Sequence, residues 1–171
     1  MRIPLTRCTL RPWARTDRDS LVHYGNNRRV WRNLDDIFPH PYTHADADAW
    51  FGFVEQQSPV TNFAIEVDGQ AIGGIGFVLM TGMFRRTAEF GYWLGEAYWG
   101  RGIASEAVQA IVPVAFAEHG LARLQAAVFE WNPASMRVLE KAGFVREGVL
   151  RHSALKDGEL IDRVLYAITR D

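Results

Sequence analysis

The sequence predicts an α/β fold built on a mixed, mostly antiparallel central sheet with helices on both faces. An apolar stretch from Thr87 to Leu94, a helical pattern beginning at Ile103 and a second apolar stretch from Leu124 to Phe129 form a strand, helix, strand unit. A hairpin pattern over 62–80 precedes this unit, and two more strand patterns within 145–169 follow it. The strand, helix, strand pattern predicts a parallel strand pair, and the hairpin predicts antiparallel neighbours, so the sheet is expected to be mixed.

The N-terminal part predicts one strand followed by two helices. Leu5 to Arg11 is expected to form the first strand, and Cys8, the single cysteine, is expected to be packed there rather than catalytic. Asp17 to Asn26 predicts a helix. Ala45 to Gln57 predicts another, because Thr43 and acidic residues in the opening turn form a typical helix start.

The hairpin comprises Asn62 to Val67 and Gln70 to Met80, with Asp68-Gly69 as its turn. Gly74 and Gly76 lie within the second strand, where glycine indicates a bulge or a close approach of another backbone.

The helix that begins at Ile103 carries apolar residues at helical spacing up to His119-Gly120, which is expected to end it. Pro113 lies inside it and is expected to kink or divide the element, because proline removes a helix hydrogen bond. After the strand at Leu124 to Phe129, a second helix is expected, with Asn132 as its cap, Pro133 in its first turn and Gly143 at its end.

The C-terminal part predicts two strands, Val145 to His152 and Ile161 to Thr169. The turn-rich run Lys156-Asp157-Gly158-Glu159 is expected to separate them.

The junction between the strand ending at Leu94 and the helix at Ile103 is the strongest functional signal. Helix N-termini attract anions, because their first amides lack intrahelical acceptors and the helix dipole is positive there. Gly100 and Gly102 allow the backbone to press its amides against a diphosphate, and Arg101 either adds charge or is simply solvated. The sequence does not match the Walker motif, because arginine replaces the lysine that binds phosphate. It does not match the dinucleotide-binding fingerprint either, because Ser105 stands where the third glycine is required.

These residues resemble the GCN5-related N-acetyltransferases (GNAT), and within them the enzymes that acetylate ribosomal-protein N-termini. The family's acetyl-CoA motif [QR]-x-x-G-x-[GA] is similar to Trp99-Gly100-Arg101-Gly102-Ile103-Ala104, except that Trp99 takes the first position. Later family motifs match through Asn132, Ser135, Gly143 and Phe144, so the resemblance covers Glu89 to Phe144.

The resemblance implies a single GNAT domain over residues 1–171 and acetyl-CoA as co-substrate. It also implies that the strand carrying Tyr92, Trp93 and Leu94 splays from its neighbour, so that the pantetheine arm pairs with free backbone groups in the gap. A backbone N–H there can stabilise the oxyanion. The amide of Asn132 is expected to touch the pantetheine arm, and Arg137 to meet a phosphate unless it lies on a solvated helix face.

Acetyl transfer to an amine needs a neutral nucleophile, and an α-amino group with a pKa near ~8 is easier to deprotonate than a lysine near ~10.4. N-terminal amines are therefore the easier substrate class. Glu89 is the candidate base, because a partly buried carboxylate has a raised pKa and can relay a proton through water. The alternative is a structural glutamate paired with Arg85 or Arg86, and Glu159 and Asp162 are then the weaker candidates for the base.

Ser135 is the candidate acid for the departing thiolate. Many relatives place a tyrosine seven residues after the motif asparagine, and here that position is Leu139. Ser135 lies one helical turn earlier on the same face, as in some N-terminal acetyltransferases. The alternative is a serine that only bonds its own backbone near the cap.

The acceptor site is the least defined. The segment Asn26 to Thr43 has no strong periodicity and is expected to be either a loop over the acceptor or a packed connection. We expect no metal site, since His40 and His44 are separated by Pro41 and lack further ligands nearby.

The composition fits one domain, with 171 residues, 48% hydrophobic residues and a formal charge of -1. Neither nucleic acid nor a membrane is expected as a partner, and the lack of a signal peptide or spanning run predicts a cytoplasmic protein. The leading hypothesis is acetylation of the N-terminal α-amine of a protein or peptide by a monomer or homodimer. The alternatives are acetylation of a small amine, such as a polyamine or antibiotic, and non-catalytic acyl-CoA binding.

Overall fold

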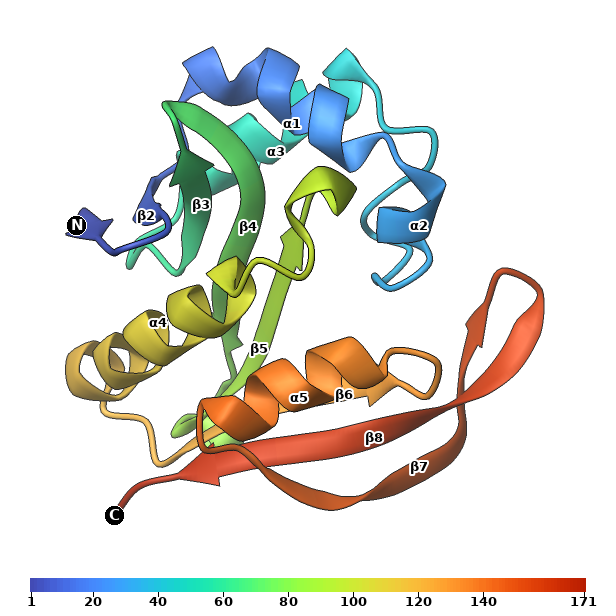
Figure 1. Cartoon of the computed structure of the whole chain (residues 1–171). Coiled ribbons are helices and arrows are strands. Elements are labelled where there is room, and N and C mark those ends of the chain that lie inside the picture. Colours follow the sequence, from blue (N-terminus) through green and yellow to red (C-terminus); the bar gives the residue numbers. More distant parts are fainter. The chain divides into compact units, whose positions relative to one another are not determined.

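The computed structural model describes all residues, 1–171, and the chain forms two compact units. The first unit comprises Met1–Gly76 and Tyr92–Ala107. It contains β1 (Ile3–Pro4), β2 (Thr9–Pro12), β3 (Asn62–Val67), the start of β4 (Gln70–Leu79), the short helices η1 (Arg15–Asp17) and η3 (Glu96–Tyr98), and the helices α1 (Arg18–Gly25), α2 (Arg28–Trp31) and α3 (His44–Val54) (Figure 1).

The second unit comprises Phe77–Gly91 and Val108–Asp171. It contains η2 (Gly82–Phe84), most of β5 (Thr87–Leu94), most of α4 (Ile103–His119), β6 (Arg123–Phe129), α5 (Pro133–Lys141), β7 (Val145–Lys156) and β8 (Glu159–Thr169). Within this unit α5 lies along the long β7–β8 pair (Figure 1).

The strands follow the order β1-β2-β3-β4-β5-β6-β8-β7 in one sheet. The sheet is mixed, since β5 and β6 are parallel, whereas β2 with β3, β3 with β4, β6 with β8 and β7 with β8 are antiparallel. The predicted α/β class is confirmed. The β5–β6 ladder joins only Thr87–Glu89 to Arg123–Gln125, although β5 continues to Leu94 and β6 to Phe129.

Three sequence predictions need correction in the first half of the chain. The predicted strand from Leu5 to Arg11 is interrupted by a turn, in which the Leu5 amide donates to the Cys8 carbonyl at 2.8 Å. Cys8 is buried as expected. The segment 26–43 contains the helix α2, whose first amides are capped by the Asn27 side chain. The helix after Thr43 ends at Val54 rather than Gln57.

Two predictions in the second half also need correction. Of the two effects predicted for Pro113, division of the helix is wrong: α4 continues to His119, because the apolar face around Ile111 and Ala115 is fully buried and outweighs one lost hydrogen bond. A kink at Pro113 stays a prediction. The C-terminal strands extend beyond the predicted bounds and leave only Asp157-Gly158 as the turn. Both turn residues have positive φ, which is typical of a tight hairpin.

Of the two glycines at which the sequence predicts a bulge or a close approach, Gly76 confirms the close approach, because a Cβ there would lie 2.6 Å from the Thr61 carbonyl oxygen. Gly73, which no sequence pattern singled out, permits a still closer approach. A Cβ built on Gly73 would lie 2.2 Å from the Trp93 carbonyl oxygen and 2.8 Å from Leu94 Cδ2. Glycine at this position therefore fixes how closely the end of β5 can lie beside β4.

Replacing Gly73 with alanine is expected to lower the free energy of unfolding by about 2–3 kcal/mol, because the new Cβ overlaps backbone that cannot move cheaply. Urea unfolding measures this change. Gly91→Ala is the matched control, since a Cβ at Gly91 meets no atom within 4 Å. Equal stabilities for the two variants would contradict the close approach.

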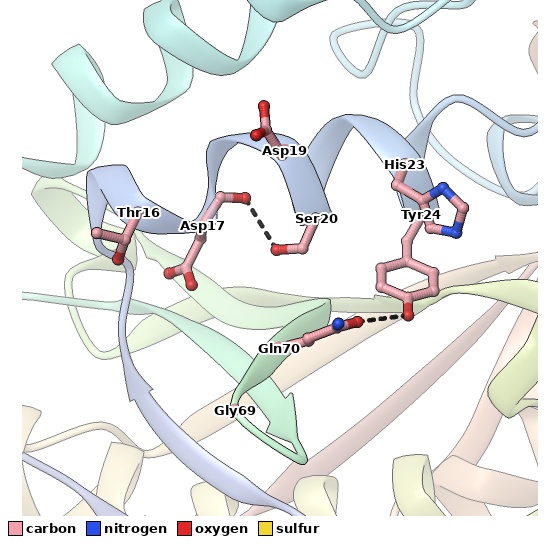
Figure 2. Close-up of a pocket in the computed structure, with 8 residues that line it drawn as sticks. All are labelled: Thr16, Asp17, Asp19, Ser20, His23, Tyr24, Gly69 and Gln70. Atoms are coloured by element: carbon pink, nitrogen blue, oxygen red, sulfur yellow. Dashed lines mark hydrogen bonds between the residues drawn. The ribbon is translucent and has the colours of Figure 1, made fainter.

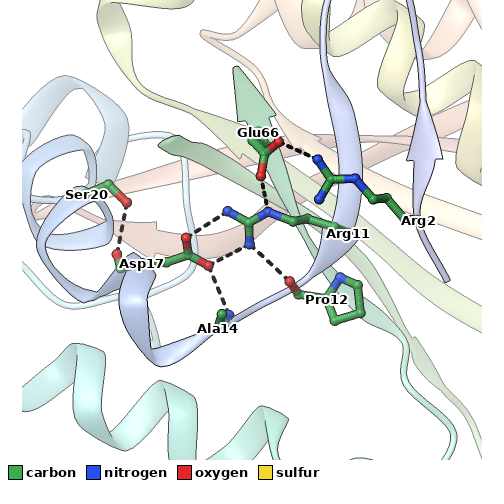
Figure 3. A network of polar contacts seen from close by, with 7 residues as sticks. All are labelled: Arg2, Arg11, Pro12, Ala14, Asp17, Ser20 and Glu66. Atoms are coloured by element: carbon green, nitrogen blue, oxygen red, sulfur yellow. Dashed lines mark hydrogen bonds and ion pairs between the residues drawn. The ribbon is translucent and has the colours of Figure 1, made fainter. Parts of the chain in front are cut away.

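A polar network joins β2, β3 and η1 in the first unit (Figure 3). The Arg11 guanidinium donates to both carboxylate oxygens of Asp17 at 2.7 Å and also bonds Glu66, which accepts a further bond from Arg2 at 2.8 Å. Asp17 is only 4% exposed, and a buried charge is costly unless it is paired. The Arg11 guanidinium and the Ala14 backbone amide supply the partners of its carboxylate.

The Arg11 hydrogen bond holds the pKa of the Glu66 carboxyl below its usual value. Such a group contributes stability that is present above its unfolded pKa and is lost as the pH falls through the folded pKa. Glu66→Gln is therefore expected to lower the free energy of unfolding by about 1–2 kcal/mol near neutral pH, and by less as the pH falls below about 4.3. Urea unfolding of both proteins over this range checks the trend, and a pH-independent difference would count against it.

Candidate functional site

The turn between β5 and α4 has a defined geometry in the first unit. It begins where the Gly95 amide donates to the Ile72 carbonyl at 2.7 Å, and the Trp99 indole N–H then donates to the Leu94 carbonyl at 2.9 Å. Gly100 and Gly102 have φ values of 73° and 78°, in the left-handed region that favours glycine. α4 begins directly after them at Ile103.

The helix end at this turn offers backbone N–H groups. The Glu106 amide donates to the Gly102 carbonyl at 3.1 Å and closes the first turn, so the amides before it have no carbonyl one turn earlier within the helix. A Cβ built on Gly100 would meet no atom within 4 Å. Glycine is thus required here by backbone conformation rather than by protein packing, and the turn is left open to a ligand. This geometry fits an anion such as a diphosphate.

Side chains of the turn between β5 and α4 interact with one another and with the segment around α2. Arg101 is exposed and its Cζ lies 5.2 Å from the Tyr98 ring centroid, which is a solvated cation-π contact. Glu96 of η3 forms an ion pair with Arg29 and accepts a hydrogen bond from the side-chain amide of Asn27 at 2.8 Å. The α2 segment is therefore fastened to the turn.

The residues Tyr92, Trp93 and Leu94 lie at the end of β5. The Trp93 ring packs 5.2 Å from the Phe38 ring, and a Cβ on Gly74 would lie 2.9 Å from its indole nitrogen. Phe38 also packs 4.7 Å from the Tyr42 ring, which is buried. The segment 26–43 is thus a packed connection with a short helix, and coverage of an acceptor stays a prediction.

Glu89 lies at the last paired position of the β5–β6 ladder, directly opposite Gln125. The Gln125 amide donates to Glu89 Oε1 at 2.7 Å. The expected partial burial is wrong, because Glu89 is exposed. The predicted alternative of pairing with arginine is wrong too: Arg85 and Arg86 donate to the carbonyls of Gly82 and Gly120 instead.

Asn132 caps α5 as predicted, with its side-chain oxygen accepting the Ser135 amide at 3.2 Å. Ser135 is half-buried, Leu139 one turn later is fully buried, and Arg137 is exposed. These contacts establish the cap. The proposed roles of Ser135 and Arg137 toward a coenzyme stay predictions.

The structure brings the predicted residues into two groups. Tyr92 to Leu94 and the turn from Trp99 to Ala104 belong to the first unit, whereas Glu89, Asn132, Ser135 and Arg137 belong to the second. Sequence reasoning missed Gln125 and Glu96. Aligning the two strands in parallel from Thr87 and Arg123 would have placed Gln125 opposite Glu89. No local sequence pattern indicates that Glu96 bonds the segment around α2.

A surface pocket of about 570 Å³ lies elsewhere in the first unit (Figure 2). It is lined by residues of η1, α1 and the β3–β4 turn and by the first residue of β4, Gln70, whose Oε1 accepts a bond from the Tyr24 hydroxyl at 2.9 Å. None of the predicted site residues lines it. The structure contains no group of three or more metal-ligating side chains, and His44 instead lies 3.0 Å from Asp19. None of its helices combines the length and the apolar character needed to span a bilayer.

Residues 7–145 match the family model of the acetyltransferase (GNAT) domain. This match spans most of the chain and includes residues of both units, from the turn before β2 to the first residue of β7.

Several curated proteins are similar in sequence. YoaA, an uncharacterized N-acetyltransferase of Bacillus subtilis (strain 168), is 41% identical over 101 residues, which are 59% of this chain and 56% of that relative. The alignment thus spans little more than half of YoaA. A ribosomal-protein-serine acetyltransferase of Escherichia coli (strain K12) is 34% identical, with coverage of 67% and 63%. A spermidine N(1)-acetyltransferase of the same organism is 29% identical, with coverage of 93% and 84%.

Solved structures are similar over nearly the whole chain. An acetyltransferase of the GNAT family from Bacillus anthracis superposes with a TM-score of 0.83 at 28% identity, covering 99% of this chain and 98% of that one. RimL, a ribosomal L7/L12 alpha-N-protein acetyltransferase in complex with coenzyme A, has a TM-score of 0.85, with coverage of 99% and 98%. Its 21% identity makes it evidence for the fold alone.

Proposed function

The chain belongs to the GNAT acetyltransferase family, and from that premise we propose that it transfers an acetyl group from acetyl-CoA to a primary amine. The observation that carries this proposal is the turn at Gly100 and Gly102, because the positive φ values of both glycines and the open Cβ position of Gly100 suit an anion at the N-terminus of α4. We further propose that residues 1–171 act as a single domain, since the family match includes residues of both units.

Acetyl-CoA, when bound, supplies an activated acetyl group and a diphosphate. The amides of Gly102, Ile103 and Ala104 are proposed to hold the diphosphate, with Trp99, Gly100 and Arg101 shaping the turn. The backbone of Tyr92, Trp93 and Leu94 follows the point where the β5–β6 ladder ends, and we propose that it binds the pantetheine arm. Asn132 and Arg137 are proposed as further contacts.

Glu89 is proposed to accept the proton of the attacking amine through a water molecule. Gln125 engages Oε1 and orients the carboxylate, while exposure lets water reach Oε2. Ser135 is proposed to relay a proton to the leaving sulfur: its hydroxyl donates a proton to the thiolate as it takes one from water, so the hydroxyl is restored in the same step. The Ser135 backbone is fixed at the capped end of α5, because its amide donates to the Asn132 side chain.

The N-terminal α-amine of a protein or peptide is the proposed acceptor. It is easier to deprotonate than a lysine, and the similar serine acetyltransferase acts on a ribosomal protein. The similarity to the spermidine acetyltransferase favours a small amine as the second candidate. No metal is assigned a role in this scheme.

The test is acetyl-CoA consumption measured side by side on a panel of N-terminal peptides and a panel of small amines. Peptide turnover without small-amine turnover is the expected result. The reverse would establish the second candidate. Coenzyme A binding with no turnover of any amine would instead support a non-catalytic acyl-CoA-binding protein.

A further inference from the structure

An arginine from the N-terminal turn lies against the glycine turn at the start of α4. A Cβ built on Gly102 would lie 3.4 Å from Nε and 3.8 Å from Cζ of Arg7, so the guanidinium lies beside the space that a side chain at position 102 would occupy. Arg7 is 95 positions away in the chain and is not part of the family motif that includes Gly102.

The backbone around Arg7 is fixed to the same helix end. The Thr6 and Arg7 amides donate to the two carboxylate oxygens of Glu106 at 3.1 and 2.8 Å. The turn itself is closed by the bond from the Leu5 amide to the Cys8 carbonyl, and Cys8 is buried beneath it. Arg7 is thus held at the first turn of α4 by its main chain, and its side chain forms a long ion pair with Glu106.

The charge of Arg7 is only loosely compensated. Its Nη1 lies 3.7 Å from Glu106 Oε1, beyond hydrogen-bond distance, and its side chain is 54% exposed. The Glu106 carboxylate is occupied by the two amides, which reduces its repulsion of an anion at the turn. By contrast, Arg101 lies over the Tyr98 ring.

We propose that Arg7 binds the diphosphate of coenzyme A together with the amides that follow Gly102. This inference rests on the proposed function. A guanidinium beside a helix N-terminus adds a full charge and directional donors where the helix offers only partial charge. Arg7 is therefore a binding residue contributed by the segment before β2, and Glu106 is the residue that positions it.

Titration calorimetry with coenzyme A and with 3′-dephospho-coenzyme A tests the proposal. Arg7→Gln is expected to weaken binding of both ligands by about tenfold, since each contains the diphosphate. Arg7→Lys should restore part of the affinity. Arg15→Gln is the matched control, because it removes the same charge from an exposed arginine that is bound to Glu55, the C-cap residue of α3. We expect it to leave both affinities unchanged.

Three other results of the calorimetry would each contradict one part of the proposal. Unchanged affinity in Arg7→Gln, with a thermal melting curve like that of the wild type, would overturn the proposal. A loss confined to coenzyme A would overturn the assignment to the diphosphate, because it would place Arg7 at the 3′-phosphate. Failure of the wild-type protein to bind coenzyme A would refute the proposed function itself.

Discussion

Gly100→Ala is expected to weaken the binding of coenzyme A by about 10- to 100-fold, because an added Cβ both disfavours the positive φ and stands where a phosphate would approach the backbone. The protein itself has room for this methyl group, since no atom lies within 4 Å of the Cβ position. The loss should therefore appear in ligand affinity and in the KM for acetyl-CoA, with a comparatively small change in folding stability.

Gly69→Ala is the matched control for this variant. Gly69 has a φ of 78°, close to the 73° of Gly100, and it also has no atom within 4 Å of its Cβ position, but it lies in the β3–β4 turn. Both variants should lose similar stability, about 1 kcal/mol, from backbone strain. If Gly69→Ala weakened coenzyme binding as much as Gly100→Ala, the turn before α4 would have no special role.

Glu89→Gln is expected to lower kcat by about 10²- to 10³-fold, because an amide cannot accept the proton of the amine. The KM for acetyl-CoA should change little. The glutamine retains an oxygen that can accept the Gln125 bond, so the strand register and the fold should persist. Initial rates at saturating peptide and acetyl-CoA measure the effect.

Glu118→Gln, which makes the same charge change on the exposed surface of α4, is the control for general electrostatic effects. Ser135→Ala tests the acid role in the same assay. If Glu89→Gln and Ser135→Ala both retained wild-type turnover, neither residue would take part in proton transfer, and the chemistry would have to rely on backbone groups and solvent.

Much of the fold follows from local sequence patterns. Thr43 and Asp46 form a reciprocal capping box, and Asp68-Gly69 adopts the positive φ values of a hairpin turn, so short-range chemistry fixes these positions. The errors arise where tertiary packing decides. The turn at Leu5 to Cys8 is anchored by Glu106, and α4 continues through Pro113 because its neighbours are buried.

In the candidate site, too, some features follow from local sequence and others depend on tertiary structure. The glycine turn could be predicted, because its conformation demands glycine at particular positions. The bond between Glu89 and Gln125 follows only when the two strands are aligned in their parallel register, and no local pattern indicates that Glu89 is exposed. The placement of Arg7 beside Gly102 brings together segments far apart in the chain, and no local pattern encodes it.

The central claim is that the main chain between Gly100 and Ala104 binds the diphosphate of coenzyme A. The most direct measurement is an NMR titration of isotope-labelled protein, which follows each backbone amide as coenzyme A is added. We predict large shifts for the amides of Gly102, Ile103 and Ala104 at saturation and none for the distant turn glycine Gly69. Saturable binding that leaves those three amides unmoved would contradict the claim.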